Sequence, residues 1–189
     1  ATVLRRTEFM RRTGTPIWIG EFGPIYTGDP EVDASRLRLL RDQLEIYQEY
    51  GASWSLWTYK DLGVQGLVYV APDSPYTRRI APAREKKERL GADAWGGSDR
   101  GVRAVLDPID ELFDREFPDF APYPWGRRHW VHRLVRHILL AEPLVADFAR
   151  CFEGVTPEEA ERLAASFAFD RCVRRQPLAD LLRAHRRPR

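Results

Sequence analysis

One acidic residue, Glu21, lies at the end of an apolar run within PIWIGEFGPIYTG, which extends from Pro16 to Gly28. A second apolar run, ASWSLWTY, carries Trp57 near its end. A carboxylate held by a rigid element can act as a nucleophile or a general base. An indole ring offers a flat apolar face for the C–H surface of a pyranose. The pair suits chemistry on a sugar, and the alternatives are a structural ion pair for Glu21 and ordinary packing for Trp57.

A strand, a helix and a second strand are expected to position these two side chains. Pro16 opens the first strand, and Glu21 lies at its tip. The helix is predicted over 30–50, with Asp29 as its N-cap and Gly51 after its end. Its apolar positions recur at helical spacing and predict one buried stripe, formed by Leu37, Leu40, Leu44 and Tyr47.

Strand, helix and strand together occupy about 45 residues, which is the size of a βαβ unit with parallel strands and a right-handed crossover. Neighbouring parallel strands lie about 4.8 Å apart and point the same way, so their carboxyl ends meet at one edge. Functional residues of parallel α/β folds gather at that edge. We therefore expect Glu21 and Trp57 to lie side by side, whereas Trp54, on the other face of its strand, is expected in the core.

PIWIGEFG and, about 30 residues later, EIYQEYGASWSLWTYKD resemble strands seven and eight of the family 5 glycoside hydrolases, which are cellulase-like (β/α)8 barrels. The resemblance covers roughly residues 10–95. It implies that Glu21 is the catalytic nucleophile and that Trp57 forms the floor of the sugar subsite at the cleavage point. It also implies a carbohydrate substrate and a retaining mechanism, in which a second carboxylate lies about 5 to 5.5 Å away.

Four further residues follow the two strands at the same edge. Tyr26 comes after the first strand, and Tyr59, Lys60 and Asp61 come after the second. Their hydroxyl groups and charges could bind sugar hydroxyls. Each could equally be a surface residue or part of a local ion pair.

The fold class expected is α/β: the C-terminal part of a (β/α)8 barrel over residues 1–100, followed by a mainly helical extension over 101–189. A complete barrel has eight strands, and in the family the acid/base residue comes from strand four. We therefore expect a C-terminal fragment that is inactive alone and that pairs with a missing N-terminal barrel half. Four acidic residues of the extension fit a solvated helix face better than a substitute acid, namely Asp107, Asp110, Glu111 and Asp114.

The extension carries helical patterns over 101–117 and 128–150, the latter with Pro143 as a possible kink, and a capping box at Thr156 and Glu159. Tyr123, Trp125 and Trp130 could form a carbohydrate or nucleic-acid platform beside neighbouring arginines, with packing against the barrel as the favoured alternative. His129 and His132 share a helical spacing without a third metal ligand, so no metal is expected.

Composition narrows the function classes. The chain has 189 residues, 43% of them hydrophobic, and a formal net charge of +2, which argues against nucleic acid and a membrane surface as partners. Two cysteines are too few for a disulfide scaffold, which favours an intracellular location without deciding it. No cofactor is expected.

Two functional hypotheses follow from the sequence. The first is a fragment of a retaining hydrolase of β-glycosides or β-glycans. The second is a non-catalytic helical module that binds a protein or nucleic acid through its arginine-rich C-terminal half, with the barrel remnant as a scaffold.

Overall fold

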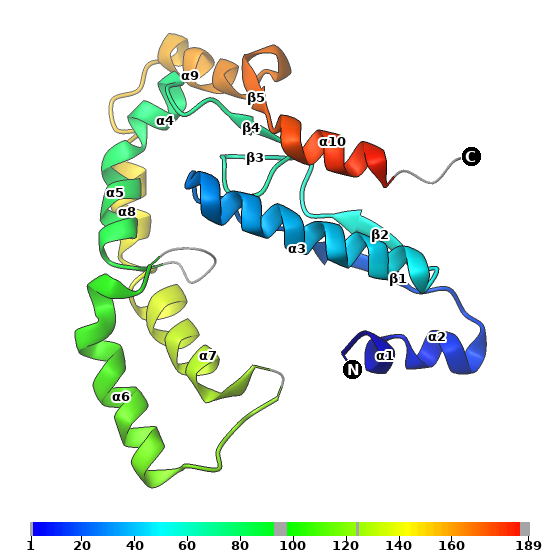
Figure 1. Cartoon of the computed structure of the whole chain (residues 1–189). Helices are drawn as coiled ribbons and strands as arrows, with labels where there is room; N and C mark the ends of the chain where they lie inside the picture. Colours follow the sequence, from blue (N-terminus) through cyan, green and yellow to red (C-terminus); the bar gives the residue numbers. More distant parts are fainter. Residues whose placement is uncertain (1, 93–97, 124, 186–189) are drawn as a thin grey trace. The chain divides into compact units, whose positions relative to one another are not determined.

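The structure is a computed structural model that describes residues 2–92, 98–123 and 125–185 (Figure 1). The chain forms two compact units. Unit 1 comprises residues 1–72 and 167–189, and unit 2 comprises residues 73–166. The predicted boundary at residue 100 between barrel and extension, and the barrel itself, stay predictions.

The centre of unit 1 is a βαβ element. Strand β1 (Trp18–Phe22) leads into helix α3 (Pro30–Glu49), and strand β2 (Ser53–Leu56) follows. The two strands are parallel, with Trp18 opposite Ser53 and Phe22 opposite Leu56. The parallel pairing predicted from the sequence is therefore confirmed.

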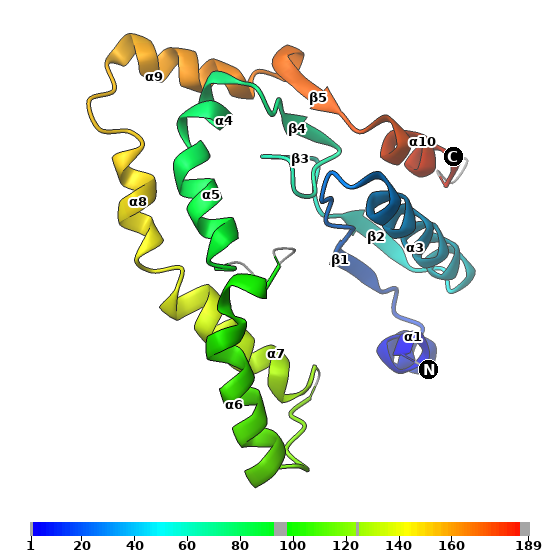
Figure 2. The same ribbon diagram turned by 60° about the vertical axis from the view of Figure 1, so that its left-hand side comes forward.

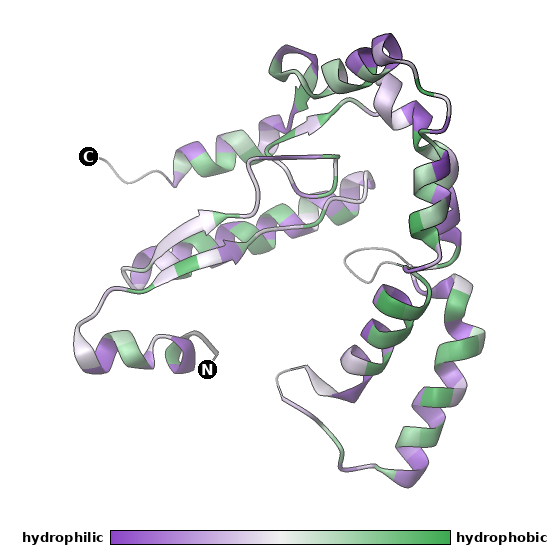
Figure 3. Ribbon diagram, turned by 180° about the vertical axis from the view of Figure 1, so that it is seen from behind, coloured by the Kyte–Doolittle hydropathy of each residue, from purple (hydrophilic) through white to green (hydrophobic). Residues whose placement is uncertain are grey.

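Helix α3 begins and ends where its sequence predicts. The Asp29 carboxylate accepts hydrogen bonds from the backbone N–H groups of Glu31 (2.9 Å) and Val32 (3.1 Å), which would otherwise be unpaired. Gly51, which follows the C-cap residue Tyr50, adopts a φ of 66°, which favours glycine. Apolar and polar residues alternate along the helix in Figure 3, and Leu40 and Leu44 are fully buried. The predicted stripe thus faces the core.

The C-terminal segment completes unit 1. Strand β4 (Val68–Val70) pairs in parallel with β3 (Lys60–Asp61) and antiparallel with β5 (Cys172–Arg174), which leads into helix α10 (Gln176–Ala184) (Figure 2). Leu178 and Leu181 of α10 pack in one core with Leu40, Leu44 and Tyr26. Residues more than 130 positions apart in the sequence therefore form a single core. The N-terminal helices of this unit are α1 (Thr2–Arg6) and α2 (Glu8–Thr13).

Unit 2 is helical in the residues that the structure describes. Its elements are α4 (Pro75–Arg79), α5 (Ala81–Arg89), η1 (Arg100–Val102), α6 (Arg103–Glu116), α7 (Gly126–Arg133), the π-helical turn η2 (Leu134–Leu139), α8 (Leu144–Arg150) and α9 (Pro157–Ala164). Two 3₁₀ turns follow, η3 (Ala165–Phe167) and η4 (Phe169–Arg171), and lead back to unit 1. The predicted capping box at Thr156 and Glu159 is confirmed.

One prediction for unit 2 is wrong. Asp110 was expected on a solvated helix face, but it is only 4% exposed. Its Oδ2 lies 2.9 Å from Nε2 of His132 on α7, and helices α6 and α7 pack against each other there. The carboxylate is buried because a partner on another helix satisfies it, and the spacing of residues within α6 carries no sign of that partner.

Candidate functional site

Glu21 and Trp57 lie at the carboxyl ends of adjacent strands. Glu21 is the fourth of five residues in β1, and Trp57 follows the last residue of β2. The Trp57 N–H donates to the carbonyl of Phe22 at 2.8 Å, which places Trp57 directly beside the residue after Glu21. Glu21 is exposed, and the Trp57 side chain is 48% exposed. The structure thus brings together the two residues singled out in the sequence.

Phe22 fixes the end of β1 on the helix side of the sheet. Its ring packs edge to face on Tyr47 of α3 and on Trp54 of β2, at centroid distances of 5.0 and 5.8 Å. Trp54 therefore contacts the core, as predicted. Phe22 is partly buried against α3, whereas Glu21, the residue before it, is exposed. The pairing of β1 with β2 is irregular between Ile19 and Phe22, and such irregularities change the direction of a strand and of its side chains.

A close approach between two backbone segments requires glycine at Gly23, the last residue of the GEFG sequence. A Cβ atom at this position would lie 2.6 Å from the carbonyl oxygen of Trp57. Its φ of 151° also lies in the region that side chains rarely adopt. Only glycine lets the loop after β1 pass this close to the backbone of Trp57.

Glu21 makes no hydrogen bond or ion pair with any residue that the structure describes. The carboxylate is open to solvent, and the indole of Trp57 lies on the neighbouring strand end. The indole offers a stacking face for a sugar ring, and the carboxylate belongs to the adjacent strand end. The arrangement is suited to nucleophilic or electrostatic chemistry on a carbohydrate.

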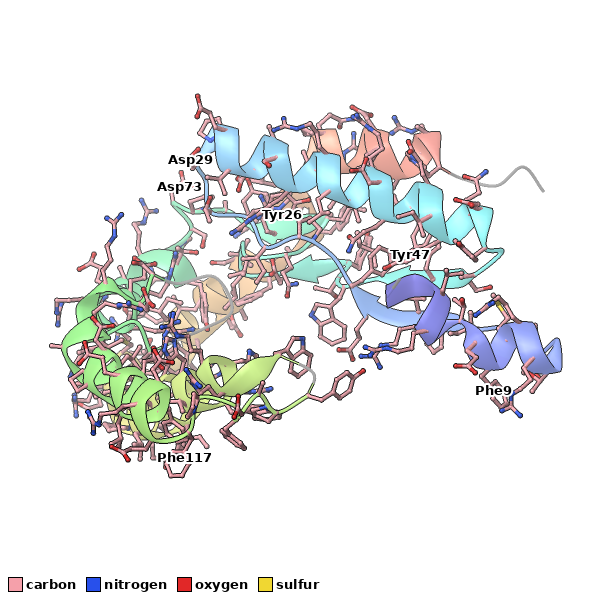
Figure 4. All side chains as sticks on the ribbon, turned by 60° about the horizontal axis from the view of Figure 1, so that its bottom comes forward. Phe9, Tyr26, Asp29, Tyr47, Asp73 and Phe117 are labelled. Carbon is pink, nitrogen blue, oxygen red and sulfur yellow. The ribbon has the colours of Figure 1, made fainter. Side chains whose placement is uncertain are left out.

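Tyr26 lies in the core of unit 1 (Figure 4). Its side chain is 8% exposed, and burial raises the pKa of its hydroxyl to about 12. The hydroxyl has no hydrogen-bond partner among the described residues. The ring lies under the guanidinium of Arg175, whose Cζ is 3.9 Å from the ring centroid. Tyr26 therefore has a structural role here, and contact with sugar stays a prediction.

Tyr59, Lys60 and Asp61 come after β2, and Lys60 and Asp61 form strand β3. The Tyr59 ring is exposed and stacks on Phe169, with 6.5 Å between centroids. The Lys60 ammonium donates to the carbonyl of Phe167. The two Asp61 carboxylate oxygens accept from the N–H groups of Gly63 (2.7 Å) and Gln65 (2.6 Å). Lys60 and Asp61 thus hold backbone segments, and sugar binding by these three residues stays a prediction.

The chain resembles a known protein over almost its whole length. It is 40% identical over 190 aligned residues to a protein of Phanerodontia chrysosporium named Beta-xylosidase. That name describes a glycoside hydrolase. The alignment covers 94% of this chain and 40% of the relative, so the chain spans less than half of that protein. No protein-family model and no solved structure matches the chain.

The alignment reaches into both compact units. Unit 2 alone is half of the chain, and only 6% of the chain lies outside the aligned region. Unit 2 is therefore shared with the relative and is not peculiar to this sequence. The comparison supports a relation to glycoside hydrolases, without distinguishing family 5 from other families.

Arg175 is a residue of this region that the sequence did not single out. Its guanidinium lies between the rings of Tyr26 and Tyr69, and it donates to the carbonyls of Gly66 (3.0 Å) and Gly63. It therefore joins the loop after β1 to strand β4 and to the connection between β3 and β4. These partners lie more than 100 positions away, so no local spacing could have revealed them.

Among residues 2–92, 98–123 and 125–185, no group of three or more His, Cys, Asp or Glu side chains could hold a metal ion. Within the same ranges, no helix is long and apolar enough to cross a membrane.

Proposed function

We propose that the chain is part of a retaining hydrolase of β-glycosides, with Glu21 as the nucleophile and Trp57 as the floor of the sugar subsite. The observation that carries the proposal is the placement of an exposed carboxylate and a half-exposed indole at the ends of paired parallel strands. The similarity to a protein named Beta-xylosidase supports the reaction class and favours a β-xyloside as substrate.

In this mechanism the sugar ring stacks on Trp57, and a Glu21 carboxylate oxygen attacks the anomeric carbon. The glycosidic bond breaks as a second carboxylic acid protonates the leaving oxygen. The resulting ester between Glu21 and the sugar is then hydrolysed by a water molecule, from which the second carboxylate removes a proton. Glu21 leaves the cycle as the free carboxylate.

The second carboxylate is proposed to come from a segment outside these 189 residues. Asp29 and Asp33 at the start of α3, and Asp61 after β2, accept hydrogen bonds from backbone N–H groups. Each of these carboxylates has a structural task near the candidate site. The family 5 resemblance supports a (β/α)8 barrel in which β1 and β2 are strands seven and eight, and an N-terminal barrel half supplies the acid/base residue. Alone, the chain is then expected to lack turnover.

A chimaera tests the assignment. Residues 1–189 would replace the matching segment of the Phanerodontia relative, and the product would be treated with a 2-deoxy-2-fluoro-β-xyloside, which traps the covalent intermediate. We expect the label on the peptide that contains Glu21. Glu21→Gln preserves the shape of the side chain and should abolish labelling and lower kcat/KM at least about 1,000-fold.

Asp61→Asn provides the matched control, because Asp61 is a carboxylate of the same region with backbone partners. It should remain labelled at Glu21. A folded, active chimaera labelled on a different carboxylate would exclude Glu21 as the nucleophile.

A further inference from the structure

Unit 2 is inserted into unit 1 by the topology of the chain. Helices α3 and α10 share one core, and the main helices and strands of unit 1 follow the order α1, α2, β1, α3, β2, β3, β4, β5 and α10. Residues 73–166 interrupt this order between β4 and β5. The chain leaves unit 1 after β4 and returns before β5, and these two strands pair with each other. Unit 2 is thus an excursion from the segment that follows Trp57.

The two ends of unit 2 are joined within the unit itself. The N–H of Tyr76, near its start, donates to the hydroxyl of Ser166, its last residue, at 3.2 Å. Helices α4 and α9 also pack together. A long insertion closed at its base is a stable module, and long excursions at the carboxyl ends of strands often carry substrate-binding residues.

Unit 2 presents an exposed aromatic cluster at the start of α7, made of Trp125, His129 and Trp130 and called the aromatic corner below. Trp125 is 61% exposed and Trp130 is 43% exposed. The two indole centroids lie 6.2 Å apart, and the ring planes are tilted by 53°. The His129 ring contacts both, at centroid distances of 4.7 and 5.6 Å.

Ion pairs between α6 and α7 hold the aromatic corner in place. Asp114 of α6 pairs with Arg127 and with Arg128, at 3.6 Å for the latter. Asp110, one turn earlier, bonds to His132. These contacts tie the first turns of α7 to α6. Rings that are already fixed lose little freedom when they bind a ligand.

We propose that the aromatic corner is a binding site for a single neutral glycan chain, at a distance along the sequence from the candidate active site. Exposed indole faces stack on the C–H faces of sugar rings. The charged groups beside them, the guanidinium of Arg128 and the carboxylate of Asp114, are both about half exposed and can bond sugar hydroxyls.

The tilt of the two indoles selects the form of the glycan. Two rings inclined by 53° cannot both lie flat on one planar surface, such as a crystalline polysaccharide. They can each contact a sugar of one chain whose successive rings are turned relative to each other. We therefore expect soluble β-xylo-oligosaccharides to bind, whereas crystalline cellulose should not retain the protein through this cluster.

The same cluster differs from a buried protein interface in its surroundings. The carboxylate of Asp114 flanks the corner through its ion pairs with Arg127 and Arg128, and aspartate is among the residue types that are depleted at protein interfaces. Unit 2 is also inserted after β4, in the part of the chain that follows Trp57, where long excursions often carry substrate-binding residues. This second point rests on the proposed glycosidase function.

Protection from oxidation tests the proposal in the 189-residue chain without any substitution. N-Bromosuccinimide oxidises exposed indoles, and the modified peptides are identified by mass spectrometry. Xylohexaose should slow oxidation of Trp125 and Trp130. Trp18, which is 66% exposed on β1, should be oxidised at an unchanged rate and serves as the internal control.

Substitution provides the second measurement. Trp125→Ala and Trp130→Ala should each raise the dissociation constant for xylohexaose about two- to tenfold, the loss of one aromatic stacking contact. Phe148→Ala removes a ring of the same unit with the same 43% exposure as Trp130 and should leave binding unchanged. Circular dichroism verifies the fold of each variant.

Several results would overturn the inference. The first is that xylohexaose does not bind, and the second is that it binds but does not slow the oxidation of Trp125 and Trp130. The third is that the protein self-associates in sugar-free solution and the contact between its copies protects the two indoles. The last is detected as a dimer mass. Failure of the proposed function is distinguishable, because Glu21→Gln should leave the protection of Trp125 intact. Conversely, Glu21 could be labelled in the chimaera while the corner binds nothing.

Discussion

At Gly23 the loop after β1 runs against the backbone of Trp57 with no space for a side chain. This contact aligns the two strand ends that carry Glu21 and Trp57, so the candidate site depends on a residue that has no chemistry of its own. Gly20, on the same strand, has open space around its Cα. The two glycines therefore offer a direct comparison.

We predict that Gly23→Ala destabilises unit 1 by about 1 to 3 kcal/mol, because alanine would combine an unfavourable φ with a clash against a backbone atom. In the active chimaera it should also lower kcat/KM. Gly20→Ala should leave the free energy of unfolding nearly unchanged or raise it slightly. Urea unfolding of the three proteins measures the difference, and equal stability for both variants would show that the close approach is dispensable.

At the scale of elements, α6 and α7 are joined through a buried carboxylate. Asp110 is nearly inaccessible, one of its oxygens bonds to His132, and the other has no partner among the described residues. Helical periodicity correctly placed a helix over this segment. It could not show which acidic residue faces the second helix, because that depends on α7, some 20 residues further along.

Asp110→Ala is predicted to destabilise unit 2 by about 1 to 3 kcal/mol, since it leaves His132, whose side chain is only 16% exposed, without its partner. It should also weaken xylohexaose binding at the aromatic corner by loosening α7. Glu111→Ala, on the exposed side of the same turn, is the control and should change stability by less than about 0.5 kcal/mol. If both variants unfold at the same urea concentration, the α6–α7 link does not depend on this carboxylate.

At the scale of the whole molecule, local signals predicted the first half of unit 1 well. The strand patterns, the Asp29 cap and the stripe of α3 all depend on neighbours within the βαβ segment, so the positions of Glu21 and Trp57 could be inferred. Strand β5 pairs with β4, and Arg175 contacts its partners, across an insertion of 94 residues. No periodic pattern in the sequence predicts contacts between residues so far apart. The contacts by which the C-terminal segment completes unit 1 are thus the part of the fold that the sequence could not reveal.

The packing of α10 against α3 leads to a prediction about how the chain unfolds. Leu178 of α10 is completely buried against α3, so Leu178→Ala should destabilise unit 1 by about 2 to 5 kcal/mol. Hydrogen exchange should then increase in the amides of α3, which is distant in sequence from the substitution. The amides of α6 in unit 2 should be unaffected, because the two units have separate cores.

Leu39→Ala, at a 59% exposed position of α3, is the matched control and should alter neither the stability of unit 1 nor the exchange of the α3 amides. An equal rise of exchange in α3 and α6 would mean that the units unfold as one, and unchanged exchange in α3 would mean that α10 is not needed to complete the core.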